Sequence, residues 1–283
     1  MRGGEMAGLE DALARQLVTA LFKSLLLREP DPPSLEAFCD LLRDGKMDVE
    51  GLVAAITGSV EFPSALPRLL PQDNDARTFF GDHSQHGEVS FLIRQMVNEA
   101  SLGRFVVDVG ARGVERSNSF DLLRVFGWRG LLVEANPSLI DGIRQGFAGL
   151  AMTLVNCAVS DYEGEARFFL GINADVSSLS RDVAEGWGST TGEISVPVRR
   201  LPTILAEHGV PHAFDLLSLD IEGEDFKVMN DLIANSPFRP RWALIEAPPS
   251  DGRRVEDFPF VAAVAEAYQM VDRVGPNLVL RCR

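Results

Sequence analysis

The sequence predicts an α/β fold, in which a mostly parallel β-sheet is covered by helices on both faces and is preceded by a small all-helical domain. From about Arg104 onward, short apolar runs rich in β-branched residues alternate with helical stretches, a pattern typical of parallel strands joined by helical crossovers. Over the first ~70 residues, by contrast, apolar side chains recur at helical spacing. The two patterns indicate two domains of different class.

Three helices are expected in the first domain. Prolines beginning with Pro30 end the first helix, Ser34 stands at the N-cap position of the second, and Asp48 can cap the third. A proline-punctuated stretch that ends in four polar residues then marks a boundary. We therefore expect a helical accessory domain over residues 1–75 and an α/β domain over residues 76–283.

The strands of the sheet are expected at five apolar runs, residues 105–109, 131–133, 152–155, 216–219 and 242–245. The helices between them are expected at residues 119–126, 138–147, 202–208 and 224–234. Alternating residues at 165–170 and 194–198 predict an antiparallel insertion, and the last two runs, 270–274 and 277–281, predict a closing hairpin.

The charge balance excludes some classes of partner. The chain of 283 residues carries 27 Lys and Arg against 41 Asp and Glu, a net charge of -14. Nucleic-acid binders normally show a basic surface, so no nucleic-acid partner is expected, and an anionic membrane surface is disfavoured for the same reason. No apolar run is long enough to span a bilayer and no signal-peptide pattern occurs, so an integral membrane protein is not expected.

The three cysteines, Cys39, Cys157 and Cys282, are widely spaced and form no CxxC pair. A disulfide framework or a zinc knuckle is therefore not expected. Reduced thiols in a cytoplasmic protein are the simpler interpretation.

Acidic residues mark the ends of four predicted strands: Asp108, Glu134, Asp220 and Glu246. Open parallel sheets bind ligands at the carboxyl ends of their strands, so these acids are expected to line a ligand site. A site lined by carboxylates suits a cationic ligand, and S-adenosylmethionine (SAM), with its sulfonium, ammonium and ribose diol, meets that demand.

Each of these positions also has a structural interpretation. The glycines after the first strand, from Gly110, let a ligand approach the main chain, or they merely form a tight turn; they do not spell GxGxxG, which counts against a dinucleotide site. Glu134 can accept two hydrogen bonds from a ribose, or it is a solvated strand-end acid. Glu224 and Asp225 are expected to cap a helix rather than contact ligand.

Several segments together resemble a known family. They are residues 107–111 (VDVGA), 117–119 (SNS), 127–137 (GWRGLLVEANP), 156–161 (NCAVSD) and 219–223 (LDIEG), with 84–88 (SQHGE) upstream. In this order they resemble the FkbM-type SAM-dependent methyltransferases, over roughly residues 80–250. The resemblance implies a Rossmann-like seven-stranded class I methyltransferase sheet, SAM as cofactor and a hydroxyl oxygen as methyl acceptor.

The resemblance also assigns roles to residues. It implies that Asp108 and Gly110 flank the methionine part of SAM, that Glu134 holds the ribose and that Asp161 meets the adenine. The full set expected at the cofactor is Gln85, Asp108, Gly110, Ala111, Ser117, Asn118, Glu134, Ala135, Asn136, Ala158, Asp161 and Asp220.

Asp220 and Glu222 are the first candidates for the catalytic base, and His86, with His83, is the second. Asp220 with Glu222 or Glu246 could hold a divalent ion through oxygen ligands, but no metal motif accompanies them, and no metal site is predicted.

The first domain has a resemblance of its own. Residues 21–31, Gly45 and residues 59–62 resemble a small helical domain of unknown function that often accompanies bacterial enzymes of surface-glycan assembly. The alternative is a generic three-helix appendage.

The predicted function is O-methylation of a hydroxyl on a glycan, a lipid-linked sugar or a small metabolite. Two other functions stay open: a nicotinamide-dependent oxidoreductase on a similar sheet, and a catalytically silent scaffold. The sequence makes no prediction of the oligomeric state or of the identity of the acceptor.

Overall fold

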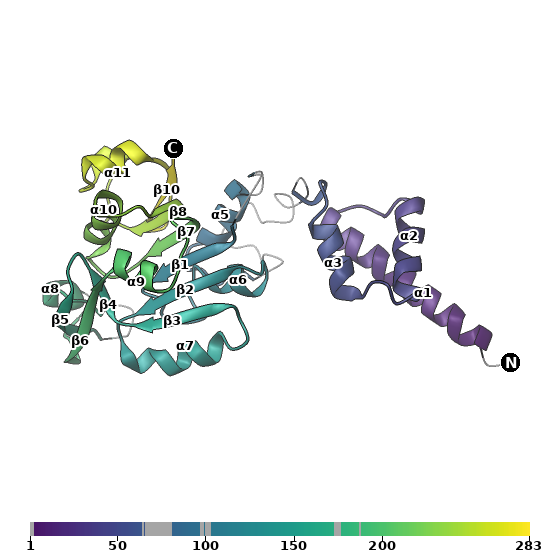
Figure 1. Cartoon of the computed structure of the whole chain (residues 1–283), viewed down its shortest axis with the longest axis horizontal. Coiled ribbons are helices and arrows are strands. Elements are labelled where there is room, and N and C mark those ends of the chain that lie inside the picture. Colours follow the sequence, from purple (N-terminus) through teal and green to yellow (C-terminus); the bar gives the residue numbers. More distant parts are fainter. Residues whose placement is uncertain are drawn as a thin grey trace. The chain divides into compact units, whose positions relative to one another are not determined.

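The computed structural model describes residues 3–63, 65, 81–96, 99, 103–172, 177–186 and 188–283. The chain divides into two compact units (Figure 1). One, the helical unit, comprises Met1–Phe79 with Leu92–Glu99, and the other, the sheet unit, comprises Phe80–Phe91 with Ala100–Arg283. The predicted boundary at residue 75 lies outside the described residues.

The helical unit begins with α1 (Gly3–Leu21), which runs into a π-helical turn, η1 (Phe22–Leu26), and is followed by α2 (Pro32–Arg43) and α3 (Val49–Thr57). Asp48 caps α3 as predicted, accepting a hydrogen bond from the Gly51 amide at 2.7 Å. The expected cap of α2 is wrong. Asp31 is the N-cap and Ser34 is its donor, because α2 starts at Pro32, a position where the missing proline N–H costs nothing.

Arg28 and Glu61 join two segments of the helical unit that are 33 residues apart in the sequence. The guanidinium donates from Nε to Oε1 at 2.5 Å and from Nη2 to Oε2 at 2.7 Å, and it lies over the Phe22 ring. The residues that make the segments 21–31 and 59–62 distinctive are therefore partners in the structure of this unit.

The sheet unit is built on a seven-stranded sheet in the order β3-β2-β1-β7-β8-β10-β9. Its strands are β1 (Phe105–Val109), β2 (Arg129–Glu134), β3 (Met152–Asn156), β7 (Ala213–Leu219), β8 (Arg239–Glu246), β9 (Tyr268–Val274) and β10 (Asn277–Cys282). The first five strands in that order pair in parallel, and β10 is antiparallel to both neighbours. The predicted Rossmann-like methyltransferase sheet and the closing hairpin are confirmed.

A second sheet of three strands has the order β4-β6-β5, with β4 (Ala158–Ser160), β5 (Gly164–Leu170) and β6 (Gly192–Arg200). The antiparallel pairing of β5 with β6 confirms the predicted insertion. The short strand β4 was not predicted, because three residues beside a polar turn carry no periodicity; it pairs in parallel with β6.

The helices of this unit are α5 (Glu88–Met96), which continues into the helical unit, α6 (Phe120–Arg124), η2 (Pro137–Leu139), α7 (Ile140–Gly146), α8 (Arg181–Ala184), α9 (Leu201–Glu207), α10 (Asp225–Asn235), η4 (Val255–Asp257) and α11 (Ala262–Ala267). Apolar side chains of α9, α10 and α11 pack with those of β1, β2, β7 and β8 in one core. Among the described helices, none is both long enough and apolar enough to cross a lipid bilayer. All three cysteines are free.

Candidate active site

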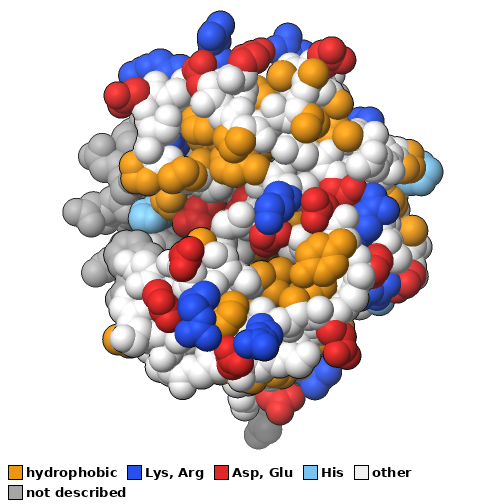
Figure 2. Space-filling view, turned by 90° about the vertical axis from the view of Figure 1, so that its left-hand side faces the viewer, with side chains coloured by type: hydrophobic (Ala, Val, Ile, Leu, Met, Phe, Trp, Pro, Cys, Tyr) orange, Lys and Arg blue, Asp and Glu red, His pale blue; other side chains and the backbone are white. Residues whose placement is uncertain are grey.

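A cavity of about 660 Å³ opens at the carboxyl ends of β1, β2, β7 and β8. Figure 2 shows this face of the molecule, with acidic side chains gathered in a hollow between apolar patches. Eight of the predicted site residues line the cavity: Gln85, His86, Gly110, Glu134, Ala135, Ala158, Asp220 and Glu222. The fold thus brings together residues from five separate segments of the sequence.

Six predicted residues do not line this cavity: Asp108, Ala111, Ser117, Asn118, Asn136 and Asp161. Sequence reasoning did not assign other lining residues to the site, among them Arg112, Leu139, Phe168, Ile172 and Leu179. The apolar members from the antiparallel insertion could have been found from the alternation of β5, which turns Phe168 inward.

Glu134 ends β2 with its carboxylate buried beside the cavity. Its Oε1 accepts a hydrogen bond from the Asn136 amide at 2.6 Å, which fixes the orientation of the carboxylate. Burial raises the pKa of Glu134 to about 7. A buried carboxylate oriented by the main chain and facing a cavity can accept hydrogen bonds from a ligand diol.

Asp108 lies in a buried polar network within the sheet, level with Leu132 of β2 and Ser218 of β7. Its Oδ2 accepts from Ser119 Oγ at 2.5 Å, and Asn118 donates to Ser218 Oγ at 3.1 Å. Ser117 Oγ accepts from the Phe120 amide at 2.9 Å at the start of α6. Burial raises the pKa of Asp108 to about 6. These bonds hold residues 117–119, at the end of the loop after β1, to the sheet.

Gly110 follows β1 with a φ of +88°, and its amide donates to the Val133 carbonyl at 2.9 Å. A Cβ at this position would lie 1.9 Å from the Asp220 carbonyl oxygen. Glycine is therefore required here by the approach of the loop after β7, a different reason from the ligand approach expected from the sequence.

The loop from Asp220 to Asp225 contributes three acidic residues to the lining of the cavity, Asp220, Glu222 and Glu224. The Asp225 carboxylate accepts from the Ile221 amide at 3.2 Å and the Gly223 amide at 3.1 Å, and Ser178 Oγ donates to the Glu222 carbonyl at 2.7 Å. These bonds hold Glu222 at a φ of +54°, which is rare for a residue with a side chain. Asp225 thus organises the loop, and Glu224 accepts from Ser160 Oγ at 2.5 Å.

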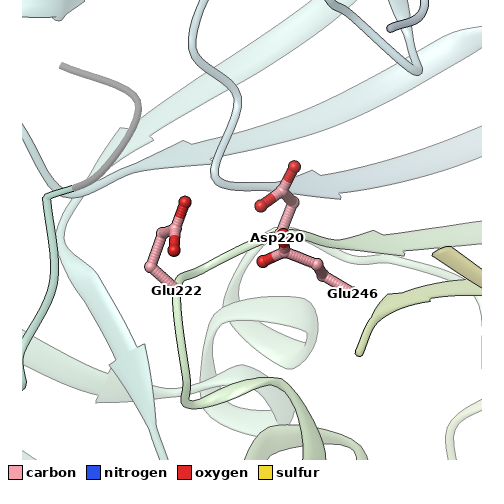
Figure 3. Close-up of side chains that lie close together, drawn as sticks. All are labelled: Asp220, Glu222 and Glu246. Carbon is pink, nitrogen blue, oxygen red and sulfur yellow. The ribbon is translucent and has the colours of Figure 1, made fainter. Parts of the chain in front are cut away.

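Three carboxylates meet in the cavity: oxygens of Asp220, Glu222 and Glu246 lie within 4.8 Å of one another (Figure 3). Burial and the neighbouring acids raise the pKa of Glu222 to about 7 and that of Glu246 to about 9, and burial raises the pKa of Asp220. Negative charges so close together and partly desolvated call for a proton or a cation among them. Among the residues that the structure describes, these three carboxylates form the cluster with the spacing to hold a divalent ion. They suit an organic cation equally well.

His86 also borders the cavity. Its amide donates to Glu88 Oε2 at 2.8 Å, and Glu88 Oε1 accepts from the buried Asn277 side chain at 2.8 Å. His83, by contrast, is held by Asp121, which accepts from its amide at 2.6 Å and contacts its Nδ1 at 3.0 Å. Of the two histidines, His86 is thus the one placed at the cavity.

The end of the cavity near the small sheet is apolar. It is lined by Ala158 and Val159 of β4, Phe168 of β5, and Leu139 and Leu179. Such a surface suits a flat aromatic group next to the diol acceptor Glu134. Asp161 is exposed just beyond β4, where Ser160 Oγ donates to it at 3.3 Å.

Comparison with known proteins gives one match. The family model described as "Methyltransferase FkbM domain" matches residues 108–269, more than half of the chain. No curated protein and no solved structure matches. The matched region runs from the end of β1 to the start of β9 and includes the three carboxylates.

Proposed function

The chain belongs to the FkbM methyltransferase family, and from that premise we propose that it is a SAM-dependent O-methyltransferase acting in the cytoplasm. The observation that carries the proposal is one cavity that combines an oriented, buried Glu134 with three converging carboxylates. The first suits a ribose diol and the second suits a sulfonium and an ammonium group. The apolar surface around Phe168 suits the adenine.

SAM supplies an activated methyl group, and the protein must align it with the acceptor. In the transfer, a lone pair of the acceptor oxygen forms the bond to the methyl carbon. The bond from that carbon to sulfur breaks, and its electron pair stays on sulfur. The hydroxyl proton must leave the acceptor oxygen in the same process.

Asp220 is the residue we assign to receive that proton. Its neighbour Glu246 has a pKa raised to about 9, so Glu246 carries a proton at neutral pH and can donate a hydrogen bond to Asp220. This hydrogen bond favours the ionised form of Asp220, against the burial that raises its pKa, and fixes its orientation for the role of a general base. Glu222, from the same loop, and His86 also line the cavity.

We propose that the acceptor hydroxyl belongs to a glycan, a lipid-linked sugar or a small metabolite. A glycan is favoured by the resemblance of the helical unit to a domain found beside enzymes of surface-glycan assembly. That unit lies outside the matched residues 108–269.

The proposal is tested with methyl-labelled SAM and an extract of glycans, lipids and small molecules from cells that carry the protein. We expect labelled product from the wild type, none from Asp220→Asn, and SAM binding by both in calorimetry. A thermal-shift comparison of SAM with NAD tests the oxidoreductase. Stabilisation by NAD alone, or full turnover by a folded Asp220→Asn variant, would refute the proposal.

A further inference from the structure

A second hollow of about 720 Å³ adjoins the cavity, and we call it the outer groove. The residues that matter here are His86, Pro249, Ser250, Asp251, Arg273 and Pro276. His86 and Pro276 also line the first cavity, so the two hollows share these two side chains as a common wall. The outer groove thus adjoins the cavity that holds the carboxylates.

The position of His86 at this junction is fixed by its surroundings. Besides the bond from its amide to Glu88, its ring packs against the main chain of Gly275, where a Cβ would lie 2.4 Å from the ring. Gly275 has a φ of +57°, in the turn between β9 and β10. The hairpin therefore leaves space for the imidazole where any other residue would fill it.

Arg273 holds the walls of the groove together. From β9 it donates to the main-chain carbonyls of Ala247 at 2.7 Å and Pro248 at 2.9 Å, and to Ser250 at 3.3 Å. It also contacts the carbonyls of Pro276 at 3.3 Å and Gly275 at 3.4 Å. Its guanidinium thus ties the loop after β8 to the hairpin and directs its donors to the protein's own main chain.

The charge around the groove disfavours an anion. Among the described residues that line the groove, Arg273 is the only lysine or arginine. Its guanidinium contacts five main-chain carbonyls. Asp251 is an exposed acid on the rim, and Asp220, Glu222 and Glu246 lie beyond His86. A phosphate or carboxylate in the groove would find the donors of Arg273 engaged by main-chain carbonyls and would lie beside the acid Asp251.

The remaining lining suits a neutral molecule with many hydroxyl groups. Pro249, Pro276 and the His86 ring offer apolar surface, while Ser250 and Asp251 offer hydrogen-bonding groups. We infer that the outer groove is the acceptor subsite, and that it takes a neutral, hydroxyl-rich unit such as an uncharged sugar and excludes units that carry phosphate or carboxylate beside the reacting hydroxyl. This inference rests on the proposed methyltransferase function.

The test compares two bulky substitutions on exposed serines. Ser250→Trp fills the groove, and Ser195→Trp on β6 places the same side chain outside it. With methyl-labelled SAM and the cell extract, Ser250→Trp should lower methyl transfer at least about tenfold, with SAM affinity by calorimetry within about twofold of wild type. Ser195→Trp should behave as wild type in both measurements.

Tandem mass spectrometry of the labelled product then reports the charge of the methylated unit itself. A neutral unit supports the inference, and a unit bearing phosphate or carboxylate overturns it, as does full transfer by Ser250→Trp. These results are distinct from failure of the proposed function, which would appear as absence of SAM binding or of any labelled product with the wild type, and which would overturn both.

Discussion

A Cβ atom on Gly110 would lie 1.9 Å from the carbonyl oxygen of Asp220, closer than any pair of non-bonded atoms can stand. The two loops that carry the site, after β1 and after β7, are therefore packed main chain to main chain. Asp220 N also donates to the Val109 carbonyl at 3.1 Å, which fixes the same approach from the other side.

We predict that Gly110→Ala displaces the Asp220 loop. It should reduce the free energy of unfolding by more than ~2 kcal/mol and SAM affinity by at least about tenfold, because both the positive φ and the clash must be relieved. Urea denaturation and calorimetry measure the two effects.

Gly149→Ala is the matched control for that substitution. Gly149 has a similar φ of +81°, and a Cβ there meets nothing within 4 Å. It should cost only the strain of a left-handed alanine, about 1 kcal/mol, and leave SAM affinity unchanged. Equal losses for the two variants would show that the contact with Asp220 has no effect of its own.

In the helical unit, the two hydrogen bonds from the Arg28 guanidinium to Glu61 are predicted to stabilise the unit. Arg28→Lys keeps the charge but cannot reproduce the planar pair of bonds. Because the pair is partly exposed, the expected loss is modest, ~0.5–1 kcal/mol. Hydrogen exchange of peptides from residues 3–62 should show faster exchange in the variant.

Lys46→Arg is the control in the same unit, since Lys46 pairs with Asp44 on the surface close by in sequence. It should leave the exchange unchanged. If Arg28→Lys also exchanges like wild type, the paired geometry has no part in holding the unit together.

The sequence-derived predictions succeeded where periodicity decides the outcome. Parallel strands with acids at their ends put Glu134, Asp220 and Glu222 at one edge of the sheet, and they meet there. Asp108 shows the limit. It shares a face of the sheet with Glu134 and Asp220, but it pairs with Leu132 and Ser218, two residues before those acids. It therefore lies within the sheet rather than at its edge, where Ser119 covers it.

The outer groove could not be predicted from the sequence for a different reason. Arg273 forms it by contacting carbonyls of residues 247–250 and of the hairpin turn. Such contacts depend on how β8 and the hairpin pack. Every residue has a main-chain carbonyl, so the amino-acid sequence does not indicate which carbonyls Arg273 contacts. The role of Gly275 beside His86 depends in the same way on a contact far apart in sequence.

We predict that SAM binding depends on pH through Glu134. In the proposed site an ionised carboxylate would accept both ribose hydroxyls, whereas the unliganded group has a pKa raised to about 7 by burial. Binding therefore expels a proton at low pH, and SAM affinity should rise roughly tenfold from pH 6 to pH 8. Calorimetry in buffers of different ionisation enthalpy measures both the affinity and the proton release.

Glu134→Gln should weaken SAM binding at pH 8 and reduce its dependence on pH, because the amide does not titrate. Glu256→Gln, at an exposed glutamate outside the cavity, is the control and should match wild type. Retention of wild-type affinity by Glu134→Gln at pH 8 would remove Glu134 from the ribose site.

We predict that the contribution of Glu246 to the stability of the unliganded protein falls as pH rises. Burial, with repulsion from Asp220, raises its pKa from 4.5 to about 9, so the folded protein holds this proton more tightly than the unfolded chain does. The stabilisation from the bound proton is greatest below the unfolded value and is lost as pH rises toward about 9. Glu246→Gln keeps the shape and removes the charge, so it should raise the free energy of unfolding of the unliganded protein, and by more at pH 8 than at pH 6. Urea denaturation at the two pH values measures this. A variant less stable than wild type at pH 8 would mean that the three carboxylates do not repel one another in the unliganded protein.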